Sequence, residues 1–127
     1  MTDLAVIIPC YNEALSITDT LTRLKPAIVK LNQIYGPLDI GIWVYDNNST
    51  DNTVEKTIEW SCLNKDISVS VNQCFEPGKG NVIRQAFMEI DARAYCMIDG
   101  DNTYGVESFT EMYEMIVNGR ADMVTGD

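Results

Sequence analysis

The stretch that decides the fold runs from Tyr95 to Thr103 and reads Tyr-Cys-Met-Ile-Asp-Gly-Asp-Asn-Thr. Its short apolar run predicts a buried strand, which ends in two carboxylates, Asp99 and Asp101, on either side of Gly100. Ligands of open α/β sheets bind just beyond the carboxyl ends of strands. Two acids held there favour a hard divalent cation that bridges to a substrate's phosphates, and the glycine lets a ligand approach closely. The alternative is an ordinary turn, since Asp-Gly and Asp-Asn pairs are common loop formers.

Apolar runs and helical periodicities alternate along the rest of the chain. Strands are expected at 4–8, 40–45, 67–71 and 121–125, and helices at 17–31, 54–63, 83–90 and 109–116. The strictly alternating 67–71 run predicts an edge strand. Pro9 is expected to end the first strand, and Pro26 to kink or divide the first helix. Inward-facing positions are expected at Val54, Ile58, Ile83, Ala86, Phe87 and Ile90.

This order of elements predicts a three-layer α/β/α fold with a mostly parallel sheet. Polar clusters follow the first, second and fourth strands. Because parallel strands joined by right-handed crossovers end at the same edge of a sheet, these clusters are expected to converge. The residues brought together in this way are Tyr11, Asn12, Glu13, Asp46, Asp99 and Asp101.

The composition and charge of the chain exclude some classes of function. The 127 residues predict a single domain, 1–127, and 46% of them are hydrophobic, enough for one core. A net charge of −10 argues against nucleic acid as a partner, and a phosphorylated substrate would need an intervening cation. No run approaches the roughly 20 apolar residues of a membrane span, and the N-terminus does not resemble a signal peptide, so a cytoplasmic location is expected. The four cysteines lack metal-site spacing and are expected to be free thiols: Cys10, Cys62, Cys74 and Cys96.

Four motifs occur in order along the chain: residues 6–13, residues 44–51, the Gly78–Gly80 loop and Asp99–Asp101. Together they resemble the family 2 glycosyltransferases of GT-A fold, and the polyprenyl-phosphate sugar transferases look most similar. The resemblance covers essentially the whole chain. It implies a Rossmann-like nucleotide-diphospho-sugar transferase fold, truncated at its C-terminus.

The resemblance also implies roles for particular residues. Tyr11 matches an aromatic that packs on the nucleotide base, and Glu13 and Asp46 match acids that contact base or ribose. Asp99 and Asp101 match the pair that holds Mg²⁺ or Mn²⁺ and, through it, the donor's diphosphate. The implied donor-binding set is Pro9, Tyr11, Asn12, Glu13, Asp46, Lys79, Arg84, Asp99 and Gly100, with no certain catalytic residue.

The function implied is a metal-dependent, inverting transfer from a GDP- or UDP-linked sugar to a polyprenyl phosphate or glycan acceptor, as in cell-envelope polysaccharide synthesis. Family members continue past the position of Asp127. The chain is therefore expected to be the donor-binding half, with little transfer alone, of a protein at the cytoplasmic face of a membrane.

Other readings of these residues remain open. Residues 96–103 also match the first motif of haloacid-dehalogenase-type phosphatases, with Asp99 as nucleophile and Asp101 as acid/base, although no lysine follows Thr103. The chain could instead be a non-catalytic nucleotide-binding or interaction fragment that forms a homo-oligomer through an exposed sheet edge. Several site residues also have purely structural readings. Tyr11 could be ordinary packing and Asp46 a turn cap, while Lys79 could be a solvated loop charge and Arg84 a charge on a helix surface.

Overall fold

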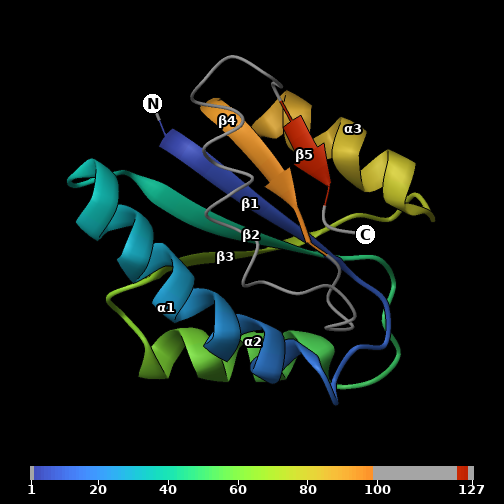
Figure 1. The fold of residues 1–127 in the computed structure, drawn as a ribbon. Coiled ribbons are helices and arrows are strands. Elements are labelled where there is room, and N and C mark those ends of the chain that lie inside the picture. Colours follow the sequence, from blue (N-terminus) through green and yellow to red (C-terminus); the bar gives the residue numbers. More distant parts are fainter. Residues whose placement is uncertain (1, 99–122, 126–127) are drawn as a thin grey trace.

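The computed structural model describes residues 2–98 and 123–125 (Figure 1). The described residues form five strands and three helices. In chain order they are β1 (Thr2–Cys10), α1 (Ile17–Tyr35), β2 (Ile40–Asp46), α2 (Thr53–Leu63), β3 (Ser68–Gln73), α3 (Lys79–Glu89), β4 (Ala92–Met97) and β5 (Met123–Thr125). The helix expected at 109–116 lies outside the described residues.

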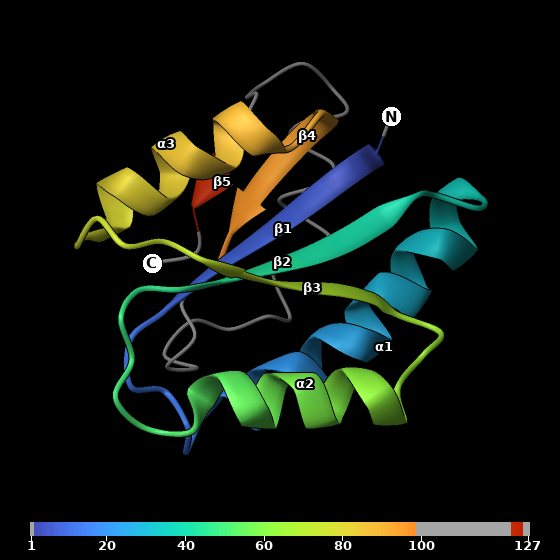
Figure 2. The ribbon, with the colours of Figure 1, turned by 180° about the vertical axis from the view of Figure 1, so that it is seen from behind.

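The strands form one sheet in the order β3-β2-β1-β4-β5, and every pair of neighbours is parallel. Helices α1 and α2 cover one face and α3 covers the other, which gives the expected three layers (Figures 1 and 2). The fold class predicted from the sequence is therefore confirmed, and β3 lies at the edge of the sheet, as its alternating pattern predicted.

The central strand β1 supplies both halves of the core. Leu4, Val6 and Ile8 pack toward α1 and α2, whereas Ala5 and Ile7 pack toward α3, and all five are fully buried. This division follows from the two-residue period of a strand, whose successive side chains point to opposite faces. A continuous apolar run in the sequence is what a strand covered on both faces requires.

Pro9 does not end β1, contrary to the prediction. The strand continues to Cys10, and Pro9 is level with Tyr45 of β2. The carbonyl of Ile7 accepts the amide of Ile98 after β4, so odd-numbered residues of β1 direct their backbone groups toward β4. The β1–β4 register ends at Ile7, and the amide that Pro9 lacks would lie just beyond it.

Helix α1 is continuous through Pro26, so the two consecutive helices considered from the sequence are not formed. Its buried stripe includes the expected Ile17, Leu21, Leu24, Ile28 and Leu31. Because this stripe recurs at three- and four-residue spacing, tertiary packing on the sheet holds the helix together across the proline.

The buried faces of α2 and α3 differ from the prediction. In α2 the inward residues are Thr53, Thr57 and Trp60, while Ile58 is 48% exposed. The indole of Trp60 is the largest apolar group on the helix, and burying it turns Ile58 outward. In α3 the buried residues are Val82 and the expected Ala86, and the expected Ile90 is buried just after the helix.

Phe87 of α3 is another departure from the predicted inward face. Its ring is 46% exposed and meets the ring of Tyr95 edge-on, with 4.8 Å between the ring centroids. Ile83 is half-buried.

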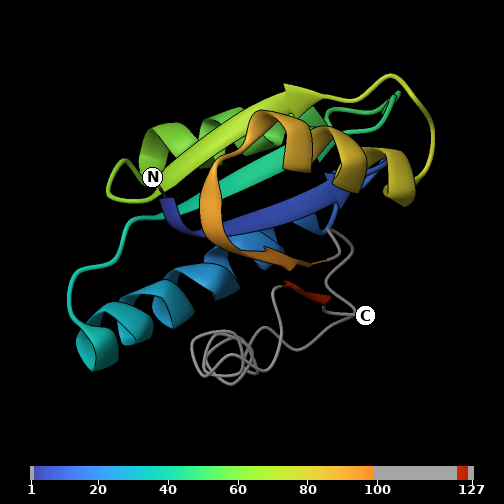
Figure 3. The same ribbon diagram turned by 90° about the horizontal axis from the view of Figure 1, so that it is seen from above.

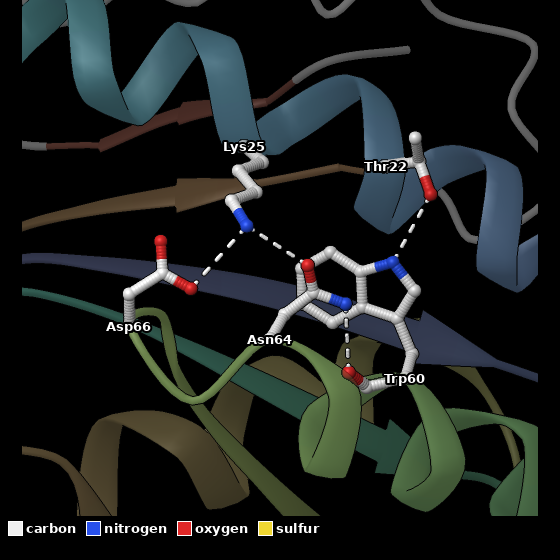
Figure 4. A network of polar contacts seen from close by, with 5 residues as sticks. All are labelled: Thr22, Lys25, Trp60, Asn64 and Asp66. Atoms are coloured by element: carbon white, nitrogen blue, oxygen red, sulfur yellow. Dashed lines mark hydrogen bonds and ion pairs between the residues drawn. The ribbon is translucent and has the colours of Figure 1, made fainter.

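A polar network joins α1 to α2 (Figure 4). The indole nitrogen of Trp60 donates to the hydroxyl of Thr22 at 3.0 Å. The ammonium of Lys25 donates to Asn64 at 2.9 Å and pairs with Asp66 at 3.3 Å, and the amide of Asn64 donates to the carbonyl of Trp60. The buried indole lies at one end of this network, whereas Lys25 and Asp66 at the other end are partly exposed.

All four cysteines are free thiols, as expected, and Cys62 is the exposed one. Burial raises the pKa of the Cys96 thiol to about 12, so this thiol stays protonated and packs as an apolar group. Over the residues that the structure describes, no helix has the length and apolar character needed to cross a bilayer.

The α1–α2 network yields a prediction about stability. Trp60→Ala should lower the free energy of unfolding by about 3–5 kcal/mol, because it empties a large buried site. Lys25→Met should lower it by less than about 1 kcal/mol, because its ion pair is solvent-screened. Urea unfolding of both variants checks this, and equal losses would contradict the division of roles.

Candidate functional site

The carboxyl ends of the strands form one edge of the sheet. Cys10 at the end of β1 is level with Asp46 at the end of β2, and Asp46 is level with Gln73 at the end of β3. Ile98, which directly precedes Asp99, donates its amide to Ile7 of β1 at 2.9 Å. The loops after β1, β2 and β3 therefore start from the same edge.

Asn12 joins the β1 loop to the β2 loop. Its side-chain oxygen accepts hydrogen bonds from the backbone amides of Thr50 at 2.7 Å and Asp51 at 3.3 Å. Its backbone amide donates to the hydroxyl of Ser49 at 2.9 Å. Its φ of 52° lies in the left-handed region, which asparagine tolerates better than most residues. Asn12 thus fixes the position of the segment that carries its neighbours Tyr11 and Glu13.

Asp51 and Thr53 complete this junction. The carboxylate of Asp51 accepts the amide of Ala14 at 3.2 Å and both the amide and the hydroxyl of Thr53. The hydroxyl of Thr53 in turn accepts the amide of Glu13 at 3.0 Å. The hydrogen bonds from Thr53 lower the pKa of the Asp51 carboxyl below its ordinary value.

Asp46 is the buried carboxylate of the site. Its side chain is only 3% exposed, and Oδ2 accepts the amide of Ser49 at 3.3 Å. The other oxygen, Oδ1, is buried and has no hydrogen-bond partner among the described residues. A buried acceptor without a donor is unfavourable by about 1–3 kcal/mol, and more if the group is charged. The fold therefore holds an acceptor at this edge that a bound donor group could satisfy.

Asn47 ties the β2 loop to the loop that leads into α3. Its amide nitrogen donates to the carbonyls of Cys74 at 2.9 Å and Glu76 at 2.8 Å, and its oxygen accepts the amide of Gly78 at 2.8 Å. Gly78 has a φ of 106°, which a side chain would strain, and it immediately precedes Lys79 at the start of α3. Lys79 is exposed at the end of α3 that follows this loop.

The structure thus brings most of the predicted site residues to one edge. Tyr11 is 58% exposed there, Glu13 is half-buried, and Pro9 is buried near the end of β1, just before them. The sequence reasoning missed the joining roles of Asn47, Ser49 and Asp51. Their place in a polar block after β2 signalled a loop, but gave no indication that their partners lie some 30 residues away in the chain.

Arg84 lies about one and a half turns beyond Lys79, on the exposed side of α3. It lines an open groove of about 510 Å³ together with Glu76, Asn81, Gln85, Met88 and Glu89. Glu89 accepts the hydroxyl of Tyr45 at 2.8 Å, and burial together with this carboxylate raises the pKa of Tyr45. Two acids thus share the groove with Arg84.

The proposed metal ligands Asp99 and Asp101, with Gly100 between them, lie outside the described residues. Within residues 2–98 and 123–125, no group of three histidine, cysteine or acidic side chains could hold a metal ion. The described part of the site supplies instead a buried carboxylate, an exposed aromatic ring and the start of a helix, which suit the nucleoside and phosphate parts of a ligand.

The parallel sheet in this strand order matches the GT-A fold of solved sugar transferases. A mannosyltransferase from Pyrobaculum calidifontis, solved with GDP-Man and Mn²⁺, superposes with a TM-score of 0.71 at 21% identity, covering 90% of this chain and 34% of that one. TarS of S. aureus in complex with UDP gives a TM-score of 0.67 at 21% identity, covering 91% and 32%. At 21% sequence identity, the structural similarity establishes the fold and nothing more.

The chain belongs to glycosyl transferase family 2, whose profile matches residues 5–127. It is 37% identical to protein RfbJ of Shigella flexneri over 98% of this chain and 84% of that protein. It is 31% identical to glycosyltransferase AglJ of Haloferax volcanii and 29% identical to dolichol-phosphate mannosyltransferase of Pyrococcus furiosus, each over 96% of this chain. It spans 35% and 32% of the lengths of these two relatives.

The junction around Asp51 yields a prediction about acid stability. The Asp51 carboxyl has a lower pKa in the folded state than in the unfolded state, where the pKa is about 3.9. Its ionised form therefore stabilises the fold at pH values above about 3.9, and this stabilisation is lost as the pH falls through the folded-state pKa. Wild type should therefore exceed Asp51→Asn in melting temperature near neutral pH, and the difference should shrink below about pH 4. Thermal unfolding of both proteins across this range checks it, and a pH-independent difference would contradict the ionic role.

Proposed function

We propose that this chain binds the nucleotide-diphosphate sugar of a metal-dependent, inverting glycosyltransferase that transfers the sugar to a polyprenyl phosphate or glycan. Family 2 membership supports sugar transfer as the general activity. The observation that carries the finer proposal is the Asp46 carboxylate, with its buried and unpartnered Oδ1 at the carboxyl edge.

Asp46 suits the nucleoside of the donor. An ionised carboxylate only accepts hydrogen bonds, and the hydroxyls of a ribose or the N–H groups of a base are donors of matching chemistry. Such a bond would recover the interaction that Oδ1 lacks, in surroundings where a charge-assisted bond is strong. The nearby ring of Tyr11 is exposed and can stack on the flat face of a base.

The phosphates of the donor need positive charge in a chain of net charge −10. In this proposal Lys79 and the amides that begin α3 contribute to it, since helix N-termini bind anions. Asp99 and Asp101 would hold Mg²⁺ or Mn²⁺, which neutralises charge on a leaving diphosphate. Mn²⁺ accompanies GDP-Man in the Pyrobaculum mannosyltransferase structure, and UDP is bound in that of TarS.

The acceptor is proposed from chemistry and from one relative. The chain is 29% identical to dolichol-phosphate mannosyltransferase of P. furiosus, which is named for a polyprenyl phosphate. A phosphate acceptor is already an anion at neutral pH, so it attacks without a strong general base. No described residue needs to be assigned that role.

The donor site is tested by calorimetric titration with GDP and with UDP, each with Mn²⁺ and with EDTA. One of the two nucleotides should bind in a metal-dependent way. Asp46→Asn should weaken that binding at least tenfold, about 1.4 kcal/mol, because the amide presents a donor where an acceptor is needed. Asp101→Ala should remove the metal dependence.

Asp39→Asn is the matched control, since it makes the same charge change at the amino end of the same strand. It should bind as wild type does. Asp46→Asn should keep a cooperative melting transition, so that its loss of binding is separated from a loss of the fold. Metal-independent binding, or equal losses in both variants, would refute the proposed site.

A further inference from the structure

β3 ends the sheet, and its outer side faces no other described element (Figure 3). Natural edge strands are usually protected from pairing by charged side chains, proline or bulges. The segment from Ile67 to Phe75 contains neither a charged residue nor a proline. This edge therefore lacks the usual protection, although the chain as a whole is strongly charged.

The hydrogen bonds at the end of β3 identify which backbone groups face outward. Cys74 donates its amide to Asp46 of β2 at 2.9 Å, so even-numbered residues direct their backbone groups toward β2. Val69, Val71 and Gln73 then direct theirs to the open side. Gln73 already accepts the side chain of Gln85 at 2.9 Å, so the open groups centre on Val69 and Val71.

We propose that β3 pairs antiparallel with β3 of a second copy of this chain, around a two-fold axis at Ser70. In this register Val69 lies opposite Val71 of the second copy, and each such pair exchanges two backbone hydrogen bonds. A register centred on Val71 would need Gln73, and one centred on Val69 would need Ile67, whose amide bonds to Asn64 at 3.0 Å. Only the register centred on Ser70 uses the open groups alone.

The side chains are also self-complementary in this register. Val69 packs toward the α1–α2 face, and by alternation Val71 lies on that face too, so the valines form apolar cross-strand pairs. Ser68, Ser70 and Asn72 share the opposite face, where Ser68 meets Asn72 of the second copy and Ser70 meets its own equivalent. Apolar side chains meet apolar ones, and polar meet polar.

The ends of the paired strands add complementary charge. Antiparallel pairing brings Lys65, before β3, near Phe75 and Glu76 of the second copy, which follow its β3. Lys65 and Glu76 are exposed, and the ring of Phe75 is 76% exposed. Asp66, at the same end, is paired within its own chain to Lys25. These contacts oppose the repulsion between two chains of net charge −10, and added salt should strengthen the pairing by screening that repulsion.

Sedimentation equilibrium of the 127-residue chain tests this pairing. The average mass should rise from 14.2 kDa toward twice that value at concentrations up to about 1 mM, which reach the weak end of specific association. Ser70→Lys and Ser70→Glu should each remain at 14.2 kDa, because like charges meet at the axis. An equal mixture of the two variants should recover the higher mass, since opposite charges then meet.

Gln33→Lys on α1 is the matched control for charge and should associate as wild type does. A second measurement does not depend on the charged variants folding. Ser70→Cys in a Cys62→Ser background should form a disulfide between two copies of the chain on oxidation. Gln33→Cys in the same background should not. Any of four outcomes would overturn the proposal. The wild type could stay at 14.2 kDa, or the mixture of charged variants could fail to recover the higher mass. Species larger than a dimer could form, or the Ser70→Cys variant could fail to crosslink.

Discussion

The parallel pairing of β1 with β2 on one side and β4 on the other is the constraint on which the site depends. It aligns Cys10 with Asp46 and Ile7 with Met97, so that loops distant in sequence leave the sheet at the same edge. The apolar run of β1, buried by helices on both faces, holds this alignment in place. The polar side chains at the edge then need only short-range hydrogen bonds to become fixed relative to one another.

At that edge most polar groups stabilise the scaffold, and one does not. Asn12, Asn47 and Asp51 each accept or donate several hydrogen bonds across loops. Asp46 is as firmly placed, yet one of its oxygens is buried without a donor. Natural sequences retain such an unfavourable group where ligand binding relieves it, which is why Asp46 carries the proposed function more strongly than the exposed Lys79 or Arg84.

The sequence predicted the layers, the parallel order and the edge position of β3, because apolar runs and helical stripes are properties of the chain itself. It failed where the outcome depends on a neighbour. Pro9 was expected to stop β1, but the proline lies where the β1–β4 ladder ends. Ile58 was expected inside, but Trp60 competes for the same surface and buries more area. The unpaired oxygen of Asp46 could not be foreseen, since a missing partner is visible only once all possible partners are placed.

Edge pairing and donor binding make separate demands on the chain. The proposed dimer uses the outer side of β3 and the two residues Phe75 and Glu76 after it, whereas Asp46 and Tyr11 of the donor site follow β2 and β1. Antiparallel pairing turns the second copy around, so the two carboxyl edges lie at opposite ends of the joined sheet. Neither site would then cover the other, and a change at Ser70 should alter assembly while leaving the surroundings of Asp46 intact. Failure of one proposal would consequently leave the other standing.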